Sequence, residues 1–291
     1  MQSRVESITS KPQQPPAASV PVSVIAPRGW ALPDFRELWR YRGLLAIFIW
    51  RDLKVRYKQT VLGVVWVVLQ PLVMTGIYTI FFGYFAHIPS DGVPYAIFVF
   101  SGLVLWQFFS RAVGEASTSL VTQQALISKI YFPRLIAPMT SVGSALADFL
   151  VLFVWLIGLM FFYGFAPTPA LVLAPFFIVL AATIALGVSL SLTALDAHYR
   201  DVRYVLGFAL QVWYFATPIL YAPSLIPERW RGLLLLNPMA PTVQGFRWTV
   251  LGDVAPPQPL AIAAAIGLAC ACLALGLVLF QRTERTIADS I

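Results

Sequence analysis

Residues that could carry out chemistry are few and scattered in this chain. No lysine follows a glycine, so the sequence lacks the phosphate-binding loop with which many ATPases hold a nucleotide. His87 and His198 lie far apart without the spacing of a metal site, and neither HExxH nor GxSxG occurs. Cys270 and Cys272 would point away from each other on a helix, which favours packing over a metal or a disulfide. We therefore expect a protein that is not an enzyme, with no metal and no cofactor of its own.

Asp148 is the one clear ionisable residue inside an apolar stretch. Carboxylates within a membrane are functional candidates. An ion-coupled secondary transporter, the weaker alternative, would need several such charges and an internal repeat. An intramembrane enzyme such as a glycan-lipid transferase would need paired carboxylates or a metal cluster, and the sequence shows neither. We expect Asp148 to make a structural or gating hydrogen bond inside a helical bundle.

Long uncharged stretches recur between residues 61 and 280. With 59% hydrophobic residues and a mean hydropathy of +0.77, the composition excludes a soluble globular domain. About 20 apolar helical residues cross a hydrocarbon core of roughly 30 Å, and only helices or closed barrels satisfy their backbone there. The sequence predicts an all-α membrane protein with six transmembrane helices, near residues 61–86, 93–112, 136–164, 170–195, 204–222 and 259–280.

The positive charges indicate orientation. A net charge of +7 could suggest nucleic acid, but all basic residues except Arg229, Arg231 and Arg247 fall in the two terminal segments and alternate connectors. The positive-inside rule explains this distribution. We therefore expect a multi-pass protein of the cell inner membrane with both termini cytoplasmic and no nucleic-acid partner. Residues 1–33 are Pro-rich without an apolar core, which predicts a disordered cytoplasmic tail rather than a signal peptide. Residues 282–291 form the cytoplasmic C-terminus.

Two segments on the cytoplasmic side could contact a partner. Residues 34–58 carry apolar residues at spacings of three and four, which predicts an amphipathic interface helix or, alternatively, a plain juxtamembrane anchor. The connector from Ala112 to Arg134 predicts a short helix against a cytoplasmic subunit, or a solvated loop. Its candidate contact residues are Gln123, Gln124, Lys129, Tyr131, Phe132, Pro133 and Arg134.

The segment from Pro218 to Gly252 lies on the opposite side. Prolines interrupt apolar runs that are too short to cross a membrane, and non-helical backbone at membrane depth needs a cover of protein or water. We expect short reentrant helices that form an outer gate, or else an ordinary external loop. The candidate gate residues are Pro218, Pro227, Asn237 and Pro238.

Aromatic residues are abundant inside the first and fifth predicted spans. Their rings could stack on sugars and line a conduit, or they could simply pack. The candidate channel residues are Trp66, Tyr78, Phe82, Tyr84, Trp213, Tyr214 and Tyr221.

Several motifs resemble those of permease subunits of polysaccharide-exporting ABC transporters of the type-2 class. Residues 51–63, RDLKVRYKQTVLG, continue to Trp66 and Pro71 as that family's pattern does. The same order continues through Phe132-Pro133-Arg134 and Tyr199-Arg200-Asp201, and then through TPILY at residues 217–221 and Asn237-Pro238. The chain is most similar to O-antigen exporter permeases, with teichoic-acid and capsule exporters as neighbours. A drug or small-lipid exporter is a further alternative, and the longer Pro-rich tail departs from the pattern.

The resemblance implies a homodimer of six-span subunits paired with two cytoplasmic ATPase subunits, which hold ATP and Mg. It also implies a channel at the dimer interface, lined by the first and fifth spans, for a lipid-linked polysaccharide on a polyprenyl diphosphate. Cationic residues before the first span could attract that diphosphate, or could serve only topology and lipid headgroups; they are Arg51, Lys54, Arg56 and Lys58.

Overall fold

All regular secondary structure in the described part of the chain is helical. The computed structural model describes residues 35–58, 63, 65–127, 129–196, 199 and 201–288, and residues 33–291 form one compact unit. The predicted disordered tail lies outside the described residues, as does Arg200. Five helical segments are long and apolar enough to cross a membrane: Val65–Phe85, Tyr95–Ser117, Ile136–Phe162, Pro169–Asp196 and Pro259–Thr283. They agree closely with five of the six predicted spans.

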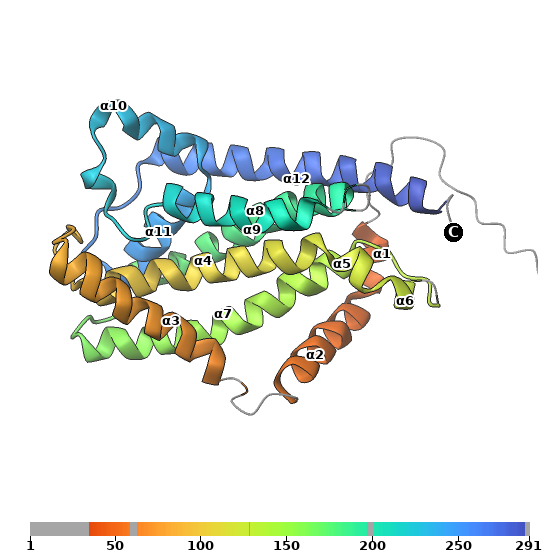
Figure 1. Ribbon diagram of the computed structural model, residues 1–291, viewed down its shortest axis with the longest axis horizontal. Coiled ribbons are helices and arrows are strands. Elements are labelled where there is room, and N and C mark those ends of the chain that lie inside the picture. The colour runs from red at the N-terminus through yellow and green to blue at the C-terminus, as the bar shows by residue number, and fades with distance from the viewer. Residues whose placement is uncertain are drawn as a thin grey trace, which may run out of the picture. The chain divides into compact units, whose positions relative to one another are not determined.

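Helix α4 (Tyr95–Ser117) occupies the centre of the bundle. In its most apolar stretch, 78% of the residues are buried, against 17% to 39% in the other four segments. It packs against α7 (Ile136–Phe162), α8 (Ala174–Asp196) and α3 (Val65–Tyr78), and Figure 1 shows these helices running side by side. Helix α3 continues as a π-helical turn, η1 (Thr79–Phe85), and much of its outer surface is exposed. The residues that α4 carries therefore face the interior of the bundle.

The most extensive helix pair joins α8 to α12 (Pro259–Ala288). A Cβ atom added to Gly187 would lie 2.5 Å from the backbone nitrogen of Leu273, and one added to Gly276 would lie 2.4 Å from the carbonyl oxygen of Gly187. Small residues allow such close backbone approach, which provides van der Waals packing where lipid removes the hydrophobic drive between helices. These two glycines fix the spacing of the pair.

The predicted fifth span has a shorter helix than expected. Helix α9 runs only from Val202 to Ala216, about 22 Å at 1.5 Å per residue, and residues 217–222 leave it in a turn. The five long segments are therefore confirmed by length and composition, whereas a sixth crossing stays a prediction.

The predicted interface helix is present but divided at Tyr41 into α1 (Phe35–Arg40) and α2 (Arg42–Lys58). The apolar residues of α2 are not confined to one face. They fill its first half, and basic residues gather towards its end, so that Trp50 and Ile47 are exposed while Phe48 is buried. The predicted amphipathic stripe is not confirmed, because apolar and basic residues separate along the helix rather than around it.

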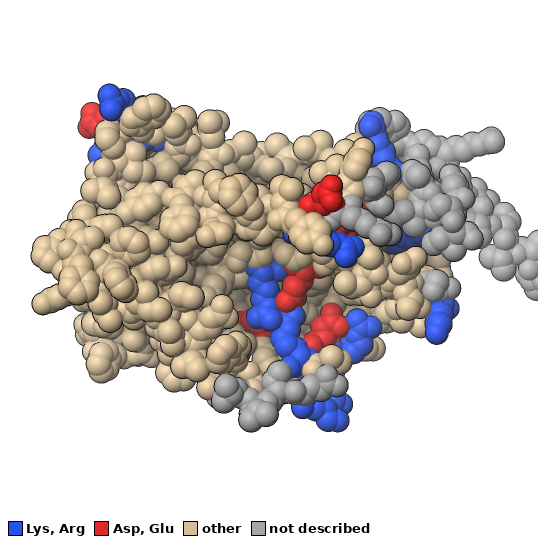
Figure 2. Space-filling model, viewed as in Figure 1, with Lys and Arg blue, Asp and Glu red and all other residues tan. Residues whose placement is uncertain are grey.

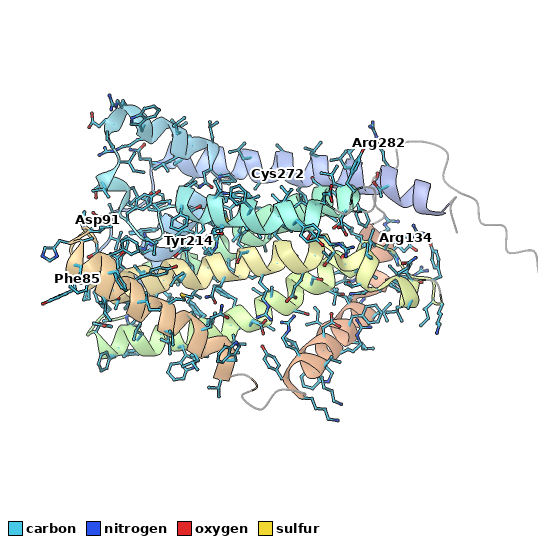
Figure 3. The ribbon with its side chains drawn as sticks, in the orientation of Figure 1. Phe85, Asp91, Arg134, Tyr214, Cys272 and Arg282 are labelled. Carbon is cyan, nitrogen blue, oxygen red and sulfur yellow. The ribbon has the colours of Figure 1, made fainter. Side chains whose placement is uncertain are left out.

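The connector and the outer segment lie at opposite ends of the bundle. After α4, the connector forms two single turns, α5 (Ser119–Thr122) and α6 (Gln124–Ile127). The outer segment forms η3 (Pro223–Leu225), α10 (Glu228–Arg231), η4 (Gly232–Leu236) and α11 (Met239–Leu251). Figure 3 shows Arg134 and Arg282 at one end, with Phe85 and Asp91 at the other. This separation agrees with the predicted topology, while the depth of α11 in the membrane stays a prediction.

Candidate functional site

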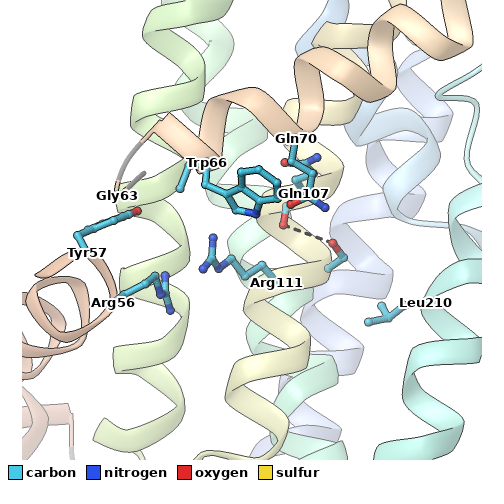
Figure 4. A pocket seen from close by; sticks show the side chains of 10 residues that line it. Arg56, Tyr57, Gly63, Trp66, Gln70, Gln107, Arg111 and Leu210 are labelled. Atoms are coloured by element: carbon cyan, nitrogen blue, oxygen red, sulfur yellow. Dashed lines mark hydrogen bonds between the residues drawn. The ribbon is translucent and has the colours of Figure 1, made fainter. Parts of the chain in front are cut away.

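A pocket opens between α2, α3, α4 and α9. Its volume is about 830 Å³, and its lining includes Trp66 and Gln70 from α3, Gln107 and Ser110 from α4, and Leu210 from α9. Arg56 and Tyr57 come from α2, and Arg111 comes from α4. Figure 4 shows these side chains converging on one space, with the Ser110 hydroxyl donating to the Gln107 carbonyl at 3.3 Å. We refer to this space as the arginine pocket.

A network of charged groups lies beside the arginine pocket. Arg56 donates to Asp148 at 2.6 Å and to both oxygens of Glu115 at 2.8 Å. Arg111 contacts Glu115 at 2.9 Å and Asp148 at 2.8 Å. The Tyr57 hydroxyl donates to the second oxygen of Asp148. Two arginines thus bridge two carboxylates, and Figure 2 shows charged atoms gathered in a hollow beside α2 on a largely uncharged face.

The network holds Asp148 by two ion pairs and a hydrogen bond, while its role stays a prediction. Its side chain is 5% exposed, and an unpaired carboxylate in such a place would pay a large desolvation cost. Its partners, Arg56 and Arg111, reach it from two different helices. Sequence reasoning missed these partners, since they lie far from Asp148 along the chain. This satisfied carboxylate favours a structural role over an ion relay.

The electrostatics keep both donors on α2 in one protonation state. Burial lowers the pKa of Arg56, but the charges of Glu115 and Asp148 outweigh it and hold that pKa above its ordinary value. Burial and the hydrogen bond to Asp148 raise the pKa of Tyr57 to about 12. The guanidinium stays charged and the phenol stays a donor near neutral pH, so the network persists there.

The four cations predicted at the lipid-diphosphate entrance have separate surroundings. Of these, Arg56 lines the arginine pocket. Arg51 binds Asp52 at 2.8 Å and lies over the Phe48 ring, while Lys54 and Lys58 are exposed. The second cation that lines the pocket is Arg111, which sequence reasoning counted only among the charges that set topology. Its position one turn before Glu115 on α4 was a signal for an ion pair that could have been noticed.

The predicted channel aromatics also divide. Trp66 and Tyr84 are 56% and 72% exposed. Tyr78 stacks on Tyr214, and these pack with Trp213 against Trp106 and Phe109 of α4 at ring separations of 5.0 to 6.5 Å. Phe82 contacts Tyr78, and the Tyr221 hydroxyl donates to the Phe215 carbonyl. Tyr78, Phe82, Trp213 and Tyr214 thus belong to a packed cluster. Trp66 instead lines the arginine pocket.

The predicted ATPase-contact residues share the end of the bundle that includes α5 and α6. Lys129 and Tyr131 are exposed, as is Gln124, whereas Gln123, Pro133 and Arg134 are partly buried. Phe132 is buried, with its ring edge-on to Phe48 at 5.5 Å. The connector is therefore anchored to α2 through these two rings.

The predicted gate residues lie at the other end of the bundle. Asn237 accepts a hydrogen bond from the Trp213 indole at 2.8 Å and donates to Thr217 and the Ala216 carbonyl. Its side chain therefore joins the end of α9 to the start of α11. Pro227 and Pro238 immediately precede α10 and α11. The Pro218 carbonyl accepts a hydrogen bond from Arg247 at 3.2 Å.

Arg247 is a buried cation that sequence reasoning missed. Its guanidinium also donates to the carbonyls of Ile219 and Phe98, and it lies 3.7 Å from the centre of the Phe98 ring. Burial of a charge is tolerated only with such compensation. A Cβ atom on Gly102 would lie 2.6 Å from Nη2, so the guanidinium would have to shift to admit a larger residue there. Arg247 thus ties α11 and the Pro218–Ile219 turn to α4.

The fold is a helical bundle with five segments long and apolar enough to cross a membrane, and the comparisons identify the chain as a transport component. The family described as ABC-2 type transporter matches residues 43–251, so the chain belongs to that family. It is 31% identical to the O-antigen export system permease protein RfbA of Myxococcus xanthus over 260 residues, 88% of this chain and 98% of the relative. A Klebsiella pneumoniae protein of the same name is 29% identical over 70% of this chain and 78% of its own length. The polysialic acid transport protein KpsM of Escherichia coli is 26% identical over 84% and 95%.

Asp148→Asn should strongly destabilise the fold. It would leave two arginines short of a buried counter-charge, which typically costs about 3 to 5 kcal/mol of unfolding free energy. Asp52→Asn is the matched control: its partner Arg51 is 41% exposed, and loss of a pair at the surface typically costs about 1 kcal/mol or less. Unfolding in detergent, followed by tryptophan fluorescence, measures both. Equal stability of the two variants would contradict the structural role of Asp148.

Gly102→Ala should loosen the outer segment. The added methyl group collides with the Arg247 guanidinium, and overpacking of this kind typically costs about 1 to 3 kcal/mol. Gly114→Ala on the same helix is the control, because nothing lies within 4 Å of its new Cβ. Limited proteolysis between α9 and α11 should be faster in the Gly102 variant alone. Unchanged cleavage would show that Arg247 does not hold this segment.

Proposed function

We propose that the chain is the membrane permease subunit of an ATP-driven exporter. Its cargo is an O-antigen-like polysaccharide on a polyprenyl diphosphate, moved across the cytoplasmic membrane. The names of the Myxococcus and Klebsiella relatives support this cargo, and the likeness covers nearly their whole length in one case. The arginine pocket carries the proposal, because it joins cationic, hydroxyl-binding and aromatic groups at one opening.

The chemistry of the pocket fits such a cargo. Guanidinium groups bind phosphate oxygens in pairs, which suits the diphosphate. Gln70, Gln107 and Ser110 can exchange hydrogen bonds with sugar hydroxyls, and the exposed face of Trp66 offers a surface on which a sugar ring can stack. The pocket would receive the junction between lipid carrier and glycan.

The assembly would be a homodimer of this chain with two ATPase subunits. The exposed apolar faces of α3 and α9, which include Val73, Ile77, Phe208 and Val212, suit a second copy across a channel. Six crossings with both termini cytoplasmic, α9 completing the sixth, would place α5 and α6 against the ATPases. Those subunits would supply ATP hydrolysis with Mg, and the outer segment would close the channel.

A second candidate cargo is a capsule polysaccharide. The likeness to the polysialic acid transport protein KpsM favours it. Teichoic acid or another lipid-linked cargo would use the same pocket chemistry. An ion-coupled transporter is less well supported, because Asp148 is held by two arginines.

Deletion of the gene tests the proposal directly. We expect surface O-antigen to fall by about tenfold or more, with lipid-linked polymer accumulating inside, because synthesis continues while export stops. A plasmid copy of the wild-type gene should restore export fully. A copy that encodes the Arg111→Gln variant should restore it poorly. Immunoblots of surface glycan and chromatography of lipid-linked polymer measure both.

The other outcomes separate the candidates. Loss of capsule in place of O-antigen would select the second cargo. Loss of polymer both at the surface and inside would indicate a role in synthesis and overturn the transport proposal, as would an unchanged surface.

A further inference from the structure

The arginine pocket presents cations in front of their counter-ions. Among the described residues, its lining includes Arg56 and Arg111, whereas Glu115 and Asp148 contact these arginines without lining the pocket themselves. A ligand that enters the pocket therefore meets the guanidinium groups first. The site favours an anion although its network holds as many acidic as basic side chains.

The two carboxylates of the network are not equivalent. Asp148 is 5% exposed and is held by both arginines and by Tyr57. Glu115 is 35% exposed, so water can solvate it once its arginine contacts break. Ion pairs at such positions are weak, because solvation of the separated charges offsets their attraction. Glu115 is the carboxylate that can leave, and Asp148 is the one that stays.

A phosphate group competes well for the contacts that Glu115 makes. Glu115 occupies Nη2 of Arg56 and Nε of Arg111, which are donors that recognise phosphate oxygens equally well. A diphosphate brings more negative charge and more acceptor oxygens than one carboxylate does. Both arginines can therefore exchange Glu115 for phosphate while each keeps a bond to Asp148.

We propose that Arg56 and Arg111 form a phosphate-binding fork in which Glu115 is the resident, exchangeable counter-ion. The ligand is the diphosphate of a polyprenyl carrier, and this choice rests on the proposed function. Its arrival displaces Glu115 and leaves Asp148 in place.

The exchange would also change how the end of α2 is held. The end of α2 is tied to α4 through the bond from Arg56 to Glu115, and its first half is tied to the connector through Phe48 and Phe132. Displacement of Glu115 replaces the first link with a phosphate shared by Arg56 and Arg111, and it keeps the second link and the bond from Arg56 to Asp148. The loaded pocket would thereby be sensed by the same helix that holds the predicted ATPase-contact segment.

Binding of a defined probe to the full chain tests the fork. The chain is placed in nanodiscs of phosphatidylcholine and titrated with a fluorescent polyprenyl diphosphate that carries no glycan. Glu115→Gln should bind about tenfold more tightly, equivalent to about 1.4 kcal/mol, because a competing charge is removed while the side-chain shape is kept. Arg111→Gln should bind at least tenfold more weakly. Asp52→Asn, which removes a carboxylate outside the network, should stay within twofold of the wild type.

Hydrogen exchange of the α2 amides supplies a second readout. Without the probe, exchange over residues 51–58 should be faster in Glu115→Gln than in the wild-type chain, and the probe should slow it there, because the bound diphosphate then links Arg56 to Arg111. Equal or weaker binding by a folded Glu115→Gln chain would overturn the proposal. So would unchanged exchange of these amides in Glu115→Gln when the probe is added.

Two further ligands separate the possible sources of phosphate. Phosphatidic acid and inorganic diphosphate are added as competitors. Weak competition by both supports the carrier, whereas equal competition by phosphatidic acid would assign the fork to lipid headgroups and overturn this proposal. The probe lacks a glycan, so its binding does not depend on export. If the fork binds the probe as expected but the deletion strain keeps its surface polysaccharide, only the proposed export function is contradicted. If the wild-type gene restores export but Glu115→Gln does not change binding of the probe, only the phosphate-binding fork is contradicted.

Discussion

The buried carboxylate of Asp148 is the group on which the arrangement of α2, α4 and α7 depends. A charge inside a helical bundle is stable only when other groups replace its water. Here the replacements are Arg56 and Tyr57 from α2 and Arg111 from α4. Helix α2 lies outside the five apolar segments, so the bundle holds a surface helix by satisfying an interior charge. The two arginines reach this charge from different helices, and both line the pocket beside it.

Hydropathy predicted the long helices well because it depends only on neighbouring residues. The boundaries of α4, α7, α8 and α12 lie close to those expected. It overestimated the helical part of the fifth span. Residues 217–222 are largely apolar, but they form a turn whose Pro218 and Ile219 carbonyls are bound by Arg247. The site was less predictable, because Arg56 lies 92 residues from Asp148 and 59 from Glu115. Sequence spacing carries no record of such pairs, and so the sequence predicts one cationic surface where the structure separates Arg56 from Arg51, Lys54 and Lys58.

The end of the bundle that includes α11 buries a cation instead of an anion, and backbone groups rather than side-chain charges compensate it. Arg247 has no exposed surface, and its guanidinium binds backbone carbonyls and an aromatic face. An irregular turn leaves carbonyl groups without helical partners, and a buried cation can satisfy several of them together. The sequence showed an arginine among prolines but gave no sign that Gly102, on another helix, makes room for it.

The two arrangements imply different mobilities at the arginine pocket and around Arg247. Side-chain carboxylates such as Glu115 can turn away into water, and a ligand can replace them at modest cost. Backbone carbonyls cannot leave Arg247 unless the turn itself moves, because the guanidinium is buried away from solvent. The arginine pocket can therefore change its contacts while the surrounding helices stay packed. Around Arg247, by contrast, a change of contacts requires a movement of the backbone between Pro218 and α11.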